Sequence, residues 1–255
     1  MKKLFALVAF AILVSVSANA QFVRFGGRLG LGASYVTDDL LTTTPIMGVN
    51  LSGYVDYMFS NMQNPWADNI YLQTGLNIIR RGTNFQQVFV DMRSIRQGYF
   101  HNWYVQVPVL AGFKYEIPQL PAENFVSFYI GPTFSCGVFG RYKDRQVTPG
   151  MPHSSNNYDT YVTMGPDAKK SFKHISRLDA GVIIGVGYQW HNFTFDFHID
   201  HCLVALMHED DVLFPLDYPD DEDGNTTAPS KPTNAYTGTN HTFMLSIGYQ
   251  LPINR

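Results

Sequence analysis

Histidine and aspartate side chains gather near the end of the segment 193–203, where Asp196, His198, Asp200 and His201 occur together. Imidazole and carboxylate groups in one place can bind a metal or move protons. Successive side chains of an extended strand point to opposite faces, so His198 and His201 face opposite sides of such a strand. They make a poor metal site together, and the pattern favours a network of hydrogen bonds inside the protein.

Two other stretches partly match a calcium-binding loop and a phosphate-binding loop, but each lacks a required feature. The acidic stretch 217–223 precedes Gly224, as in a calcium loop, but Pro219 takes a position where a ligand is needed. A solvated charge run is the favoured interpretation, and cation bridging to lipopolysaccharide is the alternative. The glycines of 26–30 resemble the spacing of a phosphate loop, but no strand-to-helix context follows them.

Two kinds of side chain could act on lipids: arginines that bind phosphate, and a nucleophile that attacks an acyl bond. Arg80, Arg81, Arg93 and Arg96 lie in or beside the segment 81–102 and could contact lipid phosphates, although solubility explains them equally well. A lipid-modifying enzyme would need a nucleophile paired with a base. We find no Gly-x-Ser-x-Gly motif and no Ser/His cluster on a lipid-facing strand. The sequence therefore predicts no enzyme, no catalytic residue, no metal site and no cofactor.

The composition of the 255 residues limits the class of protein. Only 15% of residues are charged, against about 25% in a typical soluble domain, and another 15% are aromatic. The chain is too hydrophobic for a disordered protein. Its formal charge is −3, whereas nucleic-acid binding needs a basic surface, so no nucleic acid is expected as a partner.

The first twenty residues have the features of an export signal. Lys2 and Lys3 precede the apolar run 4–14, and Ala18 and Ala20 form a cleavage pattern. This predicts a signal peptide over 1–20 and a mature domain over 21–255. Removal of the two lysines leaves 16 basic and 21 acidic side chains, a formal charge of −5. No later segment is apolar for long enough to form a transmembrane helix.

Period-two alternation divides the mature chain into strands. One face of each segment is apolar and the other is polar or glycine, over 23–35, 47–59, 70–80, 103–116, 125–142, 176–190, 193–203 and 241–251. Most of these segments are longer than ordinary strands and long enough to cross a bilayer. The sequence predicts an all-β fold, an eight-stranded antiparallel up-and-down transmembrane β-barrel.

The connections between these segments alternate in length. The connections 60–69, 117–124 and 191–192 are fairly short, 36–46 is intermediate, and 81–102, 143–175 and 204–240 are long and polar. Short periplasmic turns and longer external loops are typical of outer-membrane barrels. Cys136 and Cys202 fall two strands apart, about 9–10 Å, which is too far for a disulfide, so both are expected to be free thiols.

The polar face decides between a membrane barrel and a soluble, lipocalin-like barrel. A soluble barrel would need many charged side chains on that face. Glycine dominates it instead, with isolated charges of both signs that suit a crowded lumen. We expect a polar lumen network of Arg24, Arg28, Asp56, Lys114, Glu116, Arg177, Asp179, Asp196, His198 and Asp200, in which the cations pair with carboxylates.

Two stretches carry a family resemblance. The segment 104–115, with Tyr104, Pro108 and Leu110, resembles the Tyr-x-x-x-Pro-x-Leu strand of PorT-like outer-membrane β-barrel proteins of Bacteroidetes-type bacteria. The segment 243–251 is similar to the closing strand of that family. Some members of the family take part in type IX secretion, so the resemblance implies, as an alternative, a role as a component of such a system.

Taken together, these patterns predict an exported, non-enzymatic outer-membrane protein with a packed lumen and long extracellular loops, serving as a structural or interaction scaffold. The alternatives are a component of a type IX-like secretion system and a lipid-modifying enzyme. The expected partners are outer-membrane lipid, lipopolysaccharide and other envelope or secretion proteins.

Overall fold

The computed structural model describes residues 22–37, 42–59, 69–89, 94–117, 124–147, 156–164, 174–175, 178–204 and 238–251. Ten strands occupy them: β1 (Phe22–Thr37), β2 (Thr42–Met58), β3 (Ile70–Phe89), β4 (Ser94–Glu116), β5 (Asn124–Val147), β6 (Asn156–Met164), β7 (His174–Ile175), β8 (Leu178–Trp190), β9 (Phe193–Cys202) and β10 (Thr239–Gln250). The expected signal peptide, 1–20, lies outside these residues, as do 205–237 of the expected loop 204–240.

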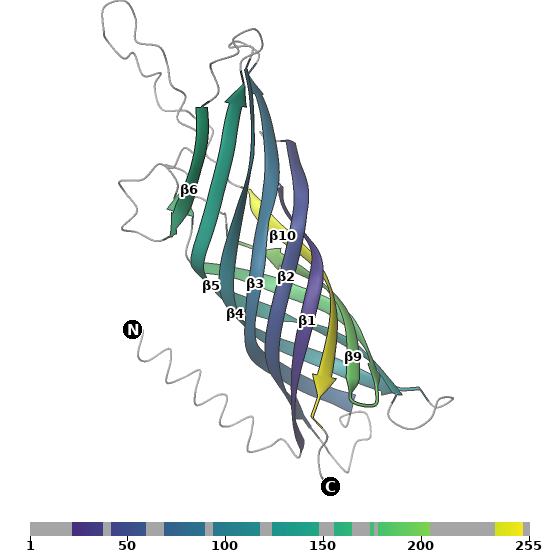
Figure 1. Cartoon of the computed structure of the whole chain (residues 1–255). Helices are drawn as coiled ribbons and strands as arrows, with labels where there is room; N and C mark the ends of the chain where they lie inside the picture. Colours follow the sequence, from purple (N-terminus) through teal and green to yellow (C-terminus); the bar gives the residue numbers. More distant parts are fainter. Residues whose placement is uncertain are drawn as a thin grey trace, which may run out of the picture.

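Eight of the strands close into a ring. Each pairs antiparallel with its neighbours in the order β4-β3-β2-β1-β10-β9-β8-β5, and pairing of β4 with β5 closes the barrel. The two ends of the barrel chain meet at one rim, where the Leu251 amide donates to the Phe25 carbonyl over 2.8 Å. Figure 1 shows this rim at the bottom. The predicted eight-stranded antiparallel barrel is confirmed.

The apolar face of every barrel strand points outward. Leu29, Leu178 and Leu245 are 63%, 70% and 66% exposed, whereas Gln106 and Asp200 on the opposite face are fully buried. A lipocalin-like barrel would place the leucines inside. The predicted orientation is therefore confirmed, and the soluble-barrel alternative is wrong.

Glycines opposite tyrosines make the lumen narrow. Tyr54 lies across from Gly26, and Tyr129 from Gly185. A Cβ added at Gly26 or Gly185 would come within 2.3 Å of the facing tyrosine ring. The glycine content of the inward face thus gives the tyrosine rings room to fill the barrel.

β3, β4 and β5 continue furthest past the barrel, and the start of β2 pairs with the base of this continuation, Thr42 with Gln86. β3 and β4 stay paired from the barrel to their tip, where Phe89 faces Ser94, and β5 pairs with β4 as far as Val147. β6 adds to the outer edge of β5 and forms no part of the ring (Figure 1). We call the paired segments 83–89, 94–100 and 141–147, together with residues 42–45 of β2 and all of β6, the extension sheet.

The extension sheet corrects two of the expected loops. The segment 81–102 is a hairpin in its described residues, and 143–175 contains the end of β5, all of β6 and the short β7. Both faces of a sheet outside a bilayer can be polar, so the period-two signal fades there although the strands continue.

A β-bulge marks the start of the extension sheet on β5. Trp103 faces Phe139 while the next residue, Tyr104, faces Gly137, so Val138 is an extra residue in β5. An extra residue reverses which side chains point outward. Val138 and Phe139 are accordingly both exposed, at 58% and 54%.

Aromatic side chains bound the apolar surface of β4. Trp103 and Tyr115 lie on its outward face, twelve residues apart. With a strand tilt of about 40°, that separation spans about 30 Å along the barrel axis, close to the height of a membrane barrel's apolar band with its aromatic girdles. In the described part of the chain, no helix is long and apolar enough to span a membrane.

Candidate functional site

Two networks of polar side chains fill the lumen. The lower network lies toward the rim with the chain ends and is centred on Asp56, whose Oδ2 accepts from Lys114 Nζ over 2.9 Å and from Gln250 Nε2 over 3.0 Å. Gln73 Nε2 donates to the other oxygen of Asp56. Asp56 and its three partners come from four strands, β2, β3, β4 and β10, so the lower network joins distant parts of the ring.

Arg28 extends the lower network across the lumen. Its Nε lies 3.1 Å from Asp196 Oδ2, and its Nη1 donates to Gln73 Oε1 over 3.1 Å. Its guanidinium also lies over the Tyr54 ring, 4.0 Å from the ring centroid. Two cations and two carboxylates, Arg28 and Lys114 with Asp56 and Asp196, therefore balance in charge.

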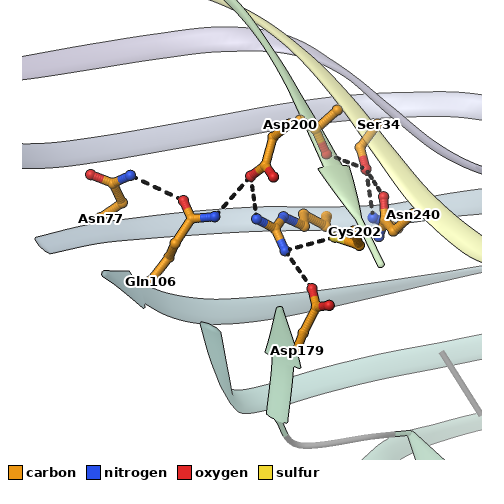
Figure 2. A network of polar contacts seen from close by, with 10 residues as sticks. Ser34, Asn77, Gln106, Asp179, Asp200, Cys202 and Asn240 are labelled. Atoms are coloured by element: carbon orange, nitrogen blue, oxygen red, sulfur yellow. Dashed lines mark hydrogen bonds and ion pairs between the residues drawn. The ribbon is translucent and has the colours of Figure 1, made fainter. Parts of the chain in front are cut away.

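The upper network is centred on Arg81. Its Nη1 donates to Asp179 Oδ2 over 2.9 Å, and its Nη2 donates to Asp200 Oδ2. Gln106 Nε2 donates to the same oxygen over 2.8 Å. Figure 2 shows Asp179, Gln106 and Asp200 converging from three strands. Arg81 and Asp200 are 1% and 0% exposed, so this is a fully buried ion pair.

A second set of hydrogen bonds lies beside the upper network. Ser34 Oγ donates to Asn240 Oδ1 over 3.0 Å and accepts from the Gly82 amide over 3.1 Å (Figure 2). Thr242 Oγ1 also lies 3.2 Å from Ser34 Oγ. These contacts join β1, β3 and β10 where β3 leaves the barrel.

The residues expected in the lumen network divide into several groups. Asp179 is partly buried, and Arg28, Asp56, Lys114, Asp196, His198 and Asp200 point inward. Arg24 is half-buried and lies opposite Asp56 in the register of β1 and β2. Glu116 is exposed at the end of β4, so its expected place in the lumen is wrong. Arg177 lies outside the described residues.

Several members of the networks were not expected from the sequence. Arg81 had been placed in an external loop, and the correction follows from β3 continuing to Phe89. Gln73 and Gln106 stand on the polar faces of their strands, and that position was a usable signal. An amide side chain can donate to one partner and accept from another, so glutamines connect the ion pairs.

The described residues offer little for metal or thiol chemistry. They contain no group of three His, Cys, Asp or Glu side chains arranged to hold a metal ion. His201 points away from His198 and contacts His241, with 2.9 Å between their Nδ1 atoms. Cys136 and Cys202 are both free thiols, as expected, and Arg81 donates to Cys202 Sγ.

The geometry of the lumen describes a polar core. In the described residues the ion pairs of the two networks are nearly enclosed. Gln73 links Arg28 to Asp56, and Gln106 links Asp200 to Asn77. The rings of Tyr54, Tyr71 and Tyr104 lie beneath the cations. Arranged this way, the charged groups hold the strands of the ring together and occupy the space that a pore would need.

Solved structures of similar architecture were found. Ail, the attachment invasion locus protein of Yersinia pestis, solved with the heparin analogue sucrose octasulfate, is 14% identical, with 90% of this chain and 99% of that chain covered and a TM-score of 0.38. Neisserial surface protein A is 10% identical, with the same two coverages and a TM-score of 0.39. The N-terminal β-barrel domain of Pseudomonas aeruginosa OprF is 8% identical, with 89% and 97% covered and a TM-score of 0.27.

No curated protein matches this chain. A family model does, and it covers residues 16–207, which is most of the sequence. That match agrees with the closed antiparallel ring and the outward apolar face. The chain belongs to the outer membrane protein beta-barrel domain family.

Proposed function

We propose that this protein is a non-enzymatic anchor in the outer membrane whose extension sheet binds partners outside the cell. The observation that supports this is the contrast between a lumen filled by ion pairs and a sheet that continues beyond the barrel. In outer-membrane barrels the short turns face the periplasm. The rim with the chain ends and the tight turn at His191 and Asn192 is therefore the periplasmic side, and the extension sheet projects outward.

The outward face of the extension sheet offers a surface for recognition. A shallow hollow there is lined by side chains from β2, β3, β4 and β5, including Thr44, Gln86, Tyr99, Lys143 and Arg145. Hydroxyl, amide, aromatic and cationic groups together suit a polar or anionic partner. A sheet supported by a barrel presents these groups with little loss of conformational entropy on binding.

The experiment compares intact protein with a variant whose extension sheet is shortened. In the variant, residues 87–96 are replaced by Asn-Gly, which joins the cross-strand pair Gln86 and Gln97 by a two-residue turn. Cells carrying either form are cross-linked from outside, and captured envelope proteins are compared. A partner that is captured by the intact form and lost with the shortened form supports the proposal. Equal capture by both forms contradicts it.

The same strains test the other two functions. The resemblance of 104–115 to PorT-like proteins supports a role in secretion, and failure of a deletion strain to export cargo would favour that role. Altered lipid A on overexpression would favour a lipid-modifying enzyme. Both readouts are independent of capture by the extension sheet.

Export by a cleaved signal peptide is part of this proposal. The sequence pattern places the cut after Ala20, so the mature protein in the envelope would begin at Gln21. N-terminal sequencing of protein purified from outer membranes tests this. An uncleaved N-terminus at Met1 would contradict it.

A further inference from the structure

We propose that Arg80, His101 and Arg141 form a binding site for the phosphate of an outer-leaflet glycolipid, on the outer surface of the barrel where the extension sheet begins. The proposal rests on the membrane orientation argued above. It does not depend on the extension sheet binding a protein partner.

The three residues lie on one face of three neighbouring strands. Arg80 faces Trp103 across the register of β3 and β4, and His101 faces Arg141 across β4 and β5. Arg80 follows the outward-facing Ile78 on β3, which is 40% exposed, whereas Ile79 and Arg81 on either side of Arg80 are buried in the lumen. The Arg80 side chain therefore belongs to the outer surface.

Two polar atoms of the site have unmet hydrogen-bonding capacity. Arg80 Nε and His101 Nδ1 are both shielded from solvent, and neither has a hydrogen-bond partner among the described residues. A buried donor without a partner carries a free-energy cost of about 1–3 kcal/mol, so such atoms call for an explanation. A phosphate oxygen that reaches the site would accept from Arg80 Nε–H, and from His101 Nδ1 when that nitrogen carries the proton.

The charges around His101 also favour an anion. Among the described residues, the charged groups that act electrostatically on its ring are Arg80 and Arg141, and both are cations. Further along β5, Lys143 and Arg145 are exposed on the same face but lie outside the site, two and four residues beyond Arg141. The bulge at Val138 creates this arrangement, because without the extra residue these cations would point to the other side of the sheet.

The surface below the site indicates a lipid. Trp103 and Phe139 stack beside Arg80 and on the bilayer side of His101 and Arg141, with ring centroids 5.9 Å apart, and Val138 is exposed beside them. This pair belongs to the aromatic girdle, so Arg80 beside it and Arg141 beyond it are at headgroup level. A ligand with a phosphate head and acyl chains fits both parts, whereas free phosphate would leave the apolar part unused.

The test measures how much lipid A stays bound to purified protein in nanodiscs of zwitterionic lipid, by native mass spectrometry. Wild-type protein should retain bis-phosphorylated lipid A, and the variant Arg80→Gln/Arg141→Gln should retain at least about tenfold less, which corresponds to about 1.4 kcal/mol. The matched control is Lys143→Gln/Arg145→Gln, which removes the same charge from the same face and should change retention less than about threefold.

Several results would overturn the site. Equal losses of bound lipid A in the two double variants would indicate that a basic surface attracts the lipid without a specific site. Equal retention of dephosphorylated lipid A by wild-type protein would remove the role of the phosphate, and this comparison needs no variant. Displacement of lipid A by millimolar inorganic phosphate would mean that the site takes free phosphate. Heat-modifiable migration on gels checks that each variant is folded.

Discussion

Arg80 and Arg81 are adjacent on β3, but their side chains point to opposite faces of the strand and have different roles. Arg81 enters the lumen and pairs with Asp179 and Asp200, while Arg80 points to the outer surface above the aromatic girdle. Breaking a buried ion pair by removing one partner costs about 3–5 kcal/mol, because the other charge stays buried. Neighbouring arginines should therefore respond very differently to the same substitution.

Substitution Arg81→Met should lower the free energy of unfolding by about 3–5 kcal/mol, because buried Asp200 and partly buried Asp179 lose their cation. Urea unfolding of protein refolded into lipid vesicles, followed by gel migration, measures this. Arg80→Met is the control and should change stability by less than about 1 kcal/mol.

A triple variant separates lost charge balance from lost packing. Adding Asp179→Asn and Asp200→Asn to Arg81→Met removes the unpaired charges, and the amide of residue 200 can still accept from Gln106. Most of the lost stability should return. If the triple variant is no more stable than Arg81→Met alone, charge balance is not what Arg81 supplies.

The sequence predicted which residues join the lumen networks only where polar and apolar residues alternate regularly along a strand. Asp56, Lys114 and Asp196 lie in segments where polar and apolar residues alternate without interruption, so their inward direction was predicted from sequence. Arg81 lies one residue past the predicted end of its segment, and Glu116 lies at the very end of another. Alternation shows which side chains of a strand point inward, but it does not show where along the strand the enclosed lumen ends.

At the scale of elements, the hairpin of β3 and β4 is the main departure from the expected fold. Its pairing is regular from Arg81 with Asn102 to Phe89 with Ser94. The strands that build it are continuous with barrel strands, so the barrel holds the base of the hairpin. The hairpin tip is not needed for the ring to close.

Replacement of residues 87–96 by Asn-Gly should leave the barrel intact, with stability within about 1 kcal/mol of wild type, because the removed residues contribute no pair within the ring. Unfolding in lipid vesicles and heat-modifiable migration measure this. Shortening further, through Phe85 and Phe100, should be destabilising, since both side chains are buried. A large loss from the first replacement would show that the tip takes part in folding.

The sequence could not locate the extension sheet for a physical reason. A strand in the bilayer must be apolar on its outer face, and this requirement produces alternation. Outside the bilayer the outward residues are polar, as Asn84, Gln86, Gln97 and Lys143 are. The bulge at Val138 added a second difficulty, because it shifts the alternation by one residue in the middle of β5.

At the scale of the whole molecule, the lumen determines whether the barrel conducts ions. An eight-stranded barrel is just wide enough for side chains to fill its interior. Here buried tyrosines, amides and ion pairs occupy it along both networks. Wild-type protein in planar bilayers should therefore show no stable conductance steps above the bare-lipid baseline, with a porin measured as the positive control. Regular steps of fixed size would contradict a filled lumen.

The depth of each outward residue in the bilayer can be tested with a matched pair of leucines. Leu245 lies in the middle of β10 and Leu178 at the start of β8, and they are 66% and 70% exposed. An arginine on the lipid-facing surface costs about 2–4 kcal/mol at the midplane and about 0–1 kcal/mol near the interface. Leu245→Arg should therefore destabilise the protein in lipid vesicles by about 2–4 kcal/mol, and Leu178→Arg by about 0–1 kcal/mol.

The comparison of these two variants is informative because exposure is nearly equal and only depth differs. In detergent micelles, which adapt their shape to the protein, the difference in destabilisation between Leu245→Arg and Leu178→Arg should be smaller. Equal costs in vesicles would mean that β10 is not centred in the bilayer. The aromatic boundary at Trp103, and with it the headgroup level assigned to Arg80 and Arg141, would then have to move.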